Sequence, residues 1–205
     1  MADILPKILN ELIEDIGVLP GVGARTAERY SLFLLKNDAH LSRRLAHSLE
    51  NLHEKIKLCP VTFAFIDSNE AISSLYSDPE RDKSLVAIVE DPFDVLAIEH
   101  TDQFNGTYHV LGGAISPIDG VTPEQLHIPE LIERIKKDNV KEIILATNPS
   151  VEGESTALYI QKQLEESAVK DIKITRLARG LPSGVDLAYA DQITISHALK
   201  GRLNI

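Results

Sequence analysis

Two short apolar runs constrain the fold of this chain more than any other feature. Residues 85–89 read Leu-Val-Ala-Ile-Val and residues 143–146 read Ile-Ile-Leu-Ala, with no polar alternation in either run. Such runs are typical of strands that are buried on both faces, as in a parallel sheet under helices. Segments with helical spacing follow both runs, the second at residues 154–166, and another strand is predicted near residue 174. This β-α-β-α-β order predicts a parallel α/β domain.

Acidic side chains come after each apolar run. Glu90 directly follows the first run, and Glu152 and Glu154 follow the second run beyond Asn148 and Pro149, which interrupt the strand. In open α/β sheets, ligands and partners bind at the carboxyl ends of the strands. We therefore expect Glu90, Glu152 and Glu154 to form one acidic cluster at that edge.

These residues carry a family resemblance. Residues 146–154 read Ala-Thr-Asn-Pro-Ser-Val-Glu-Gly-Glu and, with Glu90 upstream, resemble the Toprim domain of topoisomerases, primases and recombination proteins. In the metal-using members the positions of Asn148 and Ser150 are aspartates, so two magnesium ligands are missing here. The order of motifs along the whole chain resembles the RecR family of bacterial recombination mediators. It includes Leu-Pro-Gly-Val-Gly at residues 19–23 and Arg-Gly-Leu-Pro-Ser-Gly at residues 179–184.

The net charge of -10 is unevenly distributed along the 205 residues. Residues 1–58 hold eight Lys or Arg and eight Asp or Glu, so the whole negative excess lies in residues 59–205. The amino-terminal part is therefore the better candidate for DNA contact, and the rest is expected to face protein. No apolar run approaches the roughly 20 residues that cross a bilayer, and the first residues do not read as a signal peptide. One cysteine excludes an intrachain disulfide, which fits a cytoplasmic protein.

The amino-terminal part predicts three amphipathic helices, at residues 4–16, 24–36 and 38–57. A Gly-x-Gly turn before the second helix brings backbone N–H groups to a helix start, where these groups and the helix dipole favour a phosphate. Such contact reads the DNA backbone, so binding would not depend on base sequence. The alternative is a structural turn with two solvated arginines. The predicted DNA-binding residues are Gly21, Val22, Gly23, Arg25 and Arg29.

RecR proteins usually carry a four-cysteine zinc module after these helices. The four ligand positions hold here, in order, Cys59, Thr62, Ser73 and Tyr76. Structural zinc needs four strong donors and only the thiolate qualifies, so no zinc is predicted. We expect a degenerate zinc-finger segment that forms a small metal-free β-hairpin with the cysteine buried. Its predicted apolar mini-core has two parts. One is a strand of alternating side chains, Val61, Phe63 and Phe65. The other is a short segment that packs over this strand with Ile72, Leu75 and Tyr76.

The resemblance implies a division into a helix-hairpin-helix region at residues 1–57, the hairpin at 58–79, a Toprim domain at 80–175 and an interface segment at 176–205. It implies a non-enzymatic mediator of recombinational DNA repair in the bacterial cytoplasm, associated with the nucleoid and without a cofactor. It further implies single- and double-stranded DNA, RecO and in some systems RecF as partners in loading RecA onto single-stranded DNA. The implied assembly is a homo-oligomer, either a dimer or a tetrameric ring.

The acidic edge leaves three interpretations open. The one we favour is a surface on which carboxylates meet basic side chains of a partner such as RecO. The second is a set of solvated loop charges. The third is a magnesium-dependent Toprim enzyme that nicks, relaxes or primes nucleic acid, since carboxylates offer hard oxygen donors. Ser116 precedes a proline and His109 lies in a predicted strand, so neither is taken as a catalytic residue. The predicted partner-binding residues are Glu90, Asn148, Glu152 and Glu154.

Overall fold

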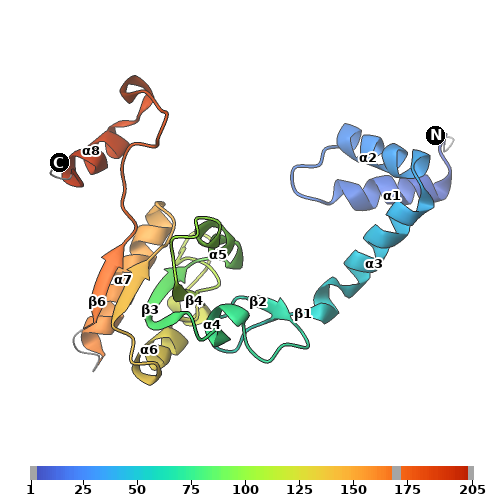
Figure 1. Cartoon of the computed structure of the whole chain (residues 1–205). Helices are drawn as coiled ribbons and strands as arrows, with labels where there is room; N and C mark the ends of the chain where they lie inside the picture. Colours follow the sequence, from blue (N-terminus) through green and yellow to red (C-terminus); the bar gives the residue numbers. More distant parts are fainter. Residues whose placement is uncertain (1–3, 168–171, 203–205) are drawn as a thin grey trace. The chain divides into compact units, whose positions relative to one another are not determined.

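The computed structural model describes residues 4–167 and 172–202 (Figure 1). The chain divides into two compact units, Met1–Ile56 and Lys57–Ile205. The first unit is helical and the second is an α/β unit. Within the described ranges, no helix has both the length and the apolar character needed to cross a membrane.

The helical unit consists of α1 (Lys7–Gly17), α2 (Ala24–Lys36) and α3 (Ala39–Lys55). All three helices were predicted, and Asp38 caps α3 by accepting a hydrogen bond from the His40 N–H at 2.8 Å. The third helix ends earlier than predicted, because the chain turns into strand β1 at Ile56. α1 packs on α2, yet neither α1 nor α3 has a buried residue. The apolar stripe of α1 is half-buried against α2, whereas Leu45, Leu49 and Leu52 of α3 are exposed in the single chain.

The α/β unit is built on a four-stranded parallel sheet in the order β4-β3-β5-β6. Its strands are β3 (Asp82–Val89), β4 (Gly106–Val110), β5 (Glu142–Leu145) and β6 (Lys173–Arg176). The connections contain three α-helices, α5 (Pro92–Glu99), α6 (Ile128–Lys137) and α7 (Val151–Glu166), and the 3-10 helix η1 (Pro123–Gln125). The predicted parallel α/β domain is confirmed.

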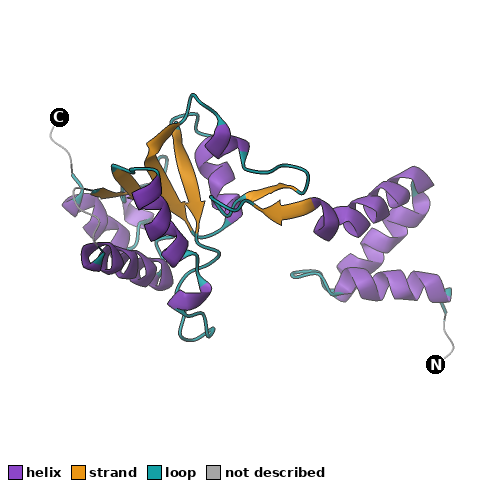
Figure 2. Cartoon of the chain, turned by 90° about the horizontal axis from the view of Figure 1, so that it is seen from below, coloured by secondary structure: helices purple, strands orange, loops and turns teal. Residues whose placement is uncertain are grey.

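Both faces of this sheet are covered, which explains the two apolar runs (Figure 2). Val86, Ile88 and Ile143 belong to one core, which they share with side chains of α6 and α7. Ala87 and Val89 belong to a second core with Val95 of α5 and residues of the hairpin. Alternate residues of the run Val86–Val89 thus enter different apolar layers, so no position of that run is left for a polar side chain.

The hairpin is formed by β1 (Ile56–Leu58) and β2 (Phe65–Asp67), and the short helix α4 (Ser74–Ser77) follows it. Cys59 is fully buried, as predicted. The predicted strand through Val61 and Phe63 is wrong, because the chain turns there and Phe63 takes a left-handed conformation with φ of 58°. The predicted self-contained mini-core is also wrong. Phe63, Ala64 and Leu75 pack into the second core of the sheet instead.

The carboxyl-terminal segment contains the 3-10 helix η2 (Leu187–Tyr189) and the helix α8 (Gln192–Lys200). Asp191 caps α8 by accepting hydrogen bonds from two backbone N–H groups. α8 has no buried residue. Large apolar side chains of this segment are more than half exposed, among them Leu187, Tyr189, Ile193 and Leu199.

Candidate functional sites

The Gly-x-Gly turn opens helix α2 in the way that the sequence predicts. Gly21 has φ of 77°, a left-handed conformation that favours glycine, and Gly23 is the N-cap of α2. The N-cap has no side chain to accept from the first N–H groups of the helix. A Cβ atom built on either glycine meets nothing within 4 Å. The start of α2 is therefore open, and its N–H groups can receive an anion.

Arg25 and Arg29 lie one turn apart on α2 and are both exposed. Arg29 lies over the ring of Tyr30, with 5.5 Å between its guanidinium carbon and the ring centroid. Neither arginine forms an ion pair with any residue that the structure describes. The five predicted DNA-binding residues thus gather at one helix start, and the guanidinium groups of the two arginines among them form no ion pair with the described residues.

On the α/β unit, Glu90 lies directly after β3 and is nearly buried, with an exposed fraction of 8%. Its carboxylate accepts two hydrogen bonds from Asn148, one from the backbone N–H at 2.9 Å and one from Nδ2 at 2.6 Å. A Cβ atom on Gly153 would lie 2.7 Å from Glu90 Oε1 and would clash with the Asn148 carbonyl oxygen. Asn148 therefore donates a hydrogen bond to each oxygen of Glu90. This contact requires glycine at position 153, because any larger side chain would clash with it.

Ser150, the other residue that stands at an aspartate position of the metal-using domains, begins helix α7. Its Oγ accepts a hydrogen bond from the Gly153 N–H at 3.0 Å, as an N-cap residue does. The helix therefore begins at Val151, earlier than the predicted residue 154. Glu152 and Glu154 consequently lie in its first turn, where the helix dipole favours carboxylates.

Glu154 binds two arginines that the sequence analysis did not connect with it. Arg176, at the end of β6, donates to both carboxylate oxygens at 2.7 Å, and Arg179 donates to Oε1. Arg176 also donates to Thr147 Oγ1 at 3.3 Å. The only available signal was topological: β6 lies beside β5, so a basic residue at its end meets the first turn of α7.

Glu152 is half-buried and its side chain has no hydrogen bond or ion pair with the described part of the chain. The three carboxylates therefore differ, because Asn148 holds Glu90, two arginines hold Glu154, and Glu152 is free. In the ranges that the structure describes, no group of three or more His, Cys, Asp and Glu side chains is placed to hold a metal ion. Glu90 nevertheless lies beside the first turn of α7, which carries Glu152 and Glu154, so the structure brings the three residues to the same edge of the sheet.

The four positions of the family's zinc module do not fit a zinc ion. They offer one thiol, two aliphatic hydroxyls and a phenol, and zinc requires four strong donors. Cys59 Sγ instead accepts hydrogen bonds from the N–H groups of Thr62 at 3.5 Å and Ser73 at 3.4 Å. Burial raises the pKa of Cys59, but the hydrogen bonds from Thr62 and from the Ser73 backbone outweigh it, so the pKa is lowered.

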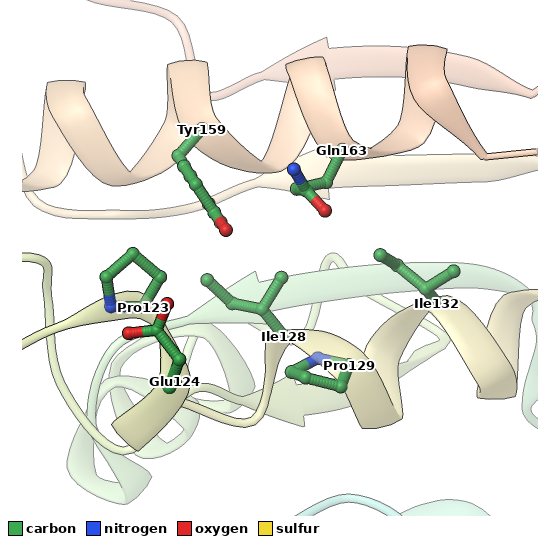
Figure 3. A pocket seen from close by; sticks show the side chains of 7 residues that line it. All are labelled: Pro123, Glu124, Ile128, Pro129, Ile132, Tyr159 and Gln163. Atoms are coloured by element: carbon green, nitrogen blue, oxygen red, sulfur yellow. The ribbon is translucent and has the colours of Figure 1, made fainter.

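A shallow hollow of about 300 Å³ lies elsewhere on the α/β unit, between α6 and α7. Figure 3 shows Tyr159 and Gln163 of α7 facing Ile128, Pro129 and Ile132 of α6. Glu124 is the one acidic residue of its lining, and no predicted site residue lines it. Its other side chains are apolar or uncharged, with Tyr159 the second titratable group of the lining.

Comparison with known proteins agrees with this architecture. A model described as "RecR, helix-hairpin-helix" matches residues 9–53, one described as "Toprim domain" matches residues 84–178, and one described as "RecR, C-terminal" matches residues 180–203. "Recombination protein RecR" of Moorella thermoacetica is 49% identical over 197 residues, which cover 96% of each chain. The protein of the same name from Tropheryma whipplei (strain Twist) is 44% identical over 196 residues, again 96% of each.

The chain belongs to the RecR family. The RecR helix-hairpin-helix range covers α2 and most of α1 and α3, and the Toprim range covers nearly all of the parallel sheet. Relatives across the full length are named as recombination proteins. A role in recombinational DNA repair follows from this membership.

Proposed function

We propose that this chain is a mediator that works with RecO, and in some settings with RecF, to load RecA onto single-stranded DNA coated by its binding protein. The observation that carries the proposal is the similarity to RecR proteins over 96% of the chain, which includes the helices, the Toprim range and the carboxyl-terminal segment. The site of action would be the bacterial cytoplasm, on the nucleoid.

The proposed DNA site is the start of α2 with Arg25 and Arg29. Open N–H groups at a helix start and two unpaired guanidinium groups suit phosphates, and this contact does not depend on base sequence. The helical part of the sequence has no net charge, whereas the rest carries the whole net charge of -10. Single- and double-stranded DNA are therefore both proposed as ligands of the helical unit and not of the α/β unit.

The proposed docking site for RecO is the edge that carries Glu152. Its carboxylate is free for a basic side chain of the partner. Glu90 acts as a positioning residue, since it fixes the loop at Asn148 from which α7 begins. Glu154 already forms ion pairs with Arg176 and Arg179, so a basic side chain of the partner could bind it only by displacing those arginines.

Assembly into a dimer or a ring around DNA is the third part of the proposal. Two surfaces support it, one on α3 and one on α8, because neither helix has a buried residue although each exposes large apolar side chains. Exposed apolar surface of this extent marks an interface between chains.

Catalysis is not part of the proposed role. Asn148 and Ser150 stand where the metal-using Toprim domains have aspartates, and both make structural hydrogen bonds here. Supercoiled plasmid incubated with the protein and Mg²⁺ should be neither nicked nor relaxed. Magnesium-dependent cleavage, relaxation or primer synthesis would instead support the alternative, a Toprim enzyme.

Reconstitution tests the proposal directly. RecA, single-stranded DNA and its binding protein are mixed with RecO, with or without this chain, and DNA-dependent ATP hydrolysis by RecA is followed. The chain should shorten the lag before hydrolysis, and only when RecO is present. An unchanged lag at all concentrations of the chain would reject the mediator role.

A further inference from the structure

We propose that a hydrogen-bonded cluster of Tyr76, Asp138 and Arg134, together with the thiol of Cys59, takes the structural place of the zinc ion that RecR proteins usually carry. The inference concerns how the hairpin is held, and it does not rest on the proposed role in RecA loading. Two groups of contacts support it, one around the sulfur of Cys59 and one around the hydroxyl of Tyr76.

Cys59 joins the two halves of the former zinc module. Its Sγ accepts from the N–H of Thr62 at 3.5 Å within the first half, and from the N–H of Ser73 at 3.4 Å in the second half, fourteen positions along the chain. The same turn is closed by the Cys59 N–H, which donates to the Ala64 carbonyl at 2.8 Å. One sulfur thus links segments that a metal ion would otherwise cross-link.

Tyr76, at the fourth former ligand position, extends this link to the α/β fold. Its hydroxyl donates to the two carboxylate oxygens of Asp138 at 3.0 and 3.1 Å. Asp138 also accepts from Arg134 Nε at 3.1 Å, and the guanidinium carbon lies 5.0 Å from the centre of the Tyr76 ring. The hairpin segment is thereby attached to the end of α6.

Arg134 also connects the cluster to strand β4 by hydrogen bonds. Its two terminal nitrogens donate to the Tyr108 carbonyl at 2.5 Å and to Thr107 Oγ1 at 2.6 Å. The side chains of Arg134 and Asp138 are only 4% and 7% exposed. A buried ion pair is stable only when its remaining donors and acceptors are satisfied, and here every nitrogen of the guanidinium group has a partner.

The hairpin turn makes two further contacts with the same unit. The Thr62 carbonyl accepts from the Val110 N–H at 2.8 Å, on β4 at the edge of the sheet. The ring of Phe63 stacks on His127 with 3.7 Å between the centroids. A zinc ion would cross-link the module to itself, whereas these contacts join it to the sheet. The hairpin should therefore open only when it separates from α6 and β4.

The first test removes one oxygen atom. Tyr76→Phe keeps the ring and deletes the hydroxyl that reaches Asp138. Hydrogen exchange of the full chain should become at least tenfold faster for amides of residues 58–78, with β3 and β5 retaining their protection. Tyr159→Phe is the matched control, because the Tyr159 hydroxyl has no hydrogen-bond partner in the described structure. Equal protection of the hairpin in Tyr76→Phe and the wild type would overturn the inference.

The second test concerns the metal. EDTA should leave the melting temperature and hairpin exchange of the wild type unchanged, and the variant T62C/S73C/Y76C should bind one zinc per chain and become sensitive to the chelator. Stoichiometric zinc in the wild type, or destabilisation of the wild type by EDTA, would contradict the inference. A triple variant that folds but takes up no zinc would also contradict the inference, because the segment would then not have the geometry of a zinc module. Neither test involves DNA or RecO, so both outcomes are separate from those of the reconstitution.

Discussion

At the scale of residues, the most informative change is the amide at position 148. An aspartate there would place a second carboxylate against Glu90, which a divalent cation would have to bridge. The asparagine instead donates two hydrogen bonds to the same carboxylate. One change from carboxylate to amide therefore replaces a metal ligand by a hydrogen-bond donor, and the edge keeps its shape without an ion.

Gly153 tests this arrangement. Gly153→Ala places a methyl group 2.7 Å from Glu90 Oε1 and against the Asn148 carbonyl oxygen, so we expect the free energy of unfolding to fall by about 1–3 kcal/mol. Ser155→Ala, at an exposed position of the same helix, should change it by less than about 0.5 kcal/mol. Urea unfolding followed by circular dichroism measures both. A Gly153→Ala variant as stable as the wild type would contradict the crowded contact.

His109 makes stability depend on pH. It is fully buried in β4, its Nε2 donates to the His127 carbonyl at 2.7 Å, and its Nδ1 has no partner among the described residues. Burial, chiefly, lowers its pKa from 6.5 to about 3. The folded chain therefore resists a proton that the unfolded chain accepts below pH 6.5. The contribution of neutral His109 to the free energy of unfolding is therefore fully present above pH 6.5. It is lost, by up to about 1.4 kcal/mol per pH unit, as the pH falls toward 3.

The variant His109→Gln separates this effect from general acid lability. Glutamine retains an amide donor and does not titrate, so stability should fall less steeply between pH 6 and pH 4 than in the wild type. Urea midpoints at several pH values give the two slopes. Parallel slopes would mean that His109 does not contribute to the acid sensitivity.

At the scale of elements, the sequence was informative wherever one local pattern decided the outcome. The stripes of α1, α2 and α3 and the apolar runs of β3 and β5 each specify their own element, and all five were predicted. The hairpin was not predicted correctly, because its apolar residues pack on the sheet and not on one another. The arginines that bind Glu154 were also missed, since that contact depends on the pairing of β5 with β6.

The start of α2 gives the prediction at this scale. Replacing Arg25 and Arg29 with Ala should weaken DNA binding and reduce the salt dependence of affinity, by roughly 0.9 in the log–log slope for each duplex phosphate that is no longer neutralised. Arg43→Ala with Arg44→Ala is the matched control, because these are two exposed arginines of α3. Fluorescence anisotropy at several salt concentrations measures the slope. A slope equal to that of the wild type would mean that α2 does not bind the DNA.

At the scale of the whole molecule, charge and apolar surface are divided between the two units. The amino-terminal part, which has no net charge, carries the open helix start, and the acidic remainder carries the free carboxylate and the exposed carboxyl-terminal helix. The division of net charge between the two parts follows from the sequence composition alone. Which apolar faces stay uncovered does not, because burial depends on the packing of distant segments, as Leu49 shows by being 69% exposed on α3.

The exposed face of α3 gives the prediction for assembly. Leu49→Glu with Leu52→Glu puts two charges on this face, so the oligomer should dissociate to a smaller species while the helical content remains. Glu50→Ala on the same helix is the control and should keep the wild-type mass. Light scattering after size exclusion reports the mass. An unchanged mass in the double variant would exclude α3 from the interface.

The measurement that tests the central claim most directly is the affinity of RecO for wild type, Glu152→Lys and Glu165→Lys, determined by calorimetry. Glu152 is the free carboxylate at the start of α7, and Glu165 is an exposed carboxylate near the other end of the same helix. The account predicts that Glu152→Lys weakens RecO binding at least tenfold while Glu165→Lys leaves it within about twofold of the wild type. Equal binding by all three chains would contradict it.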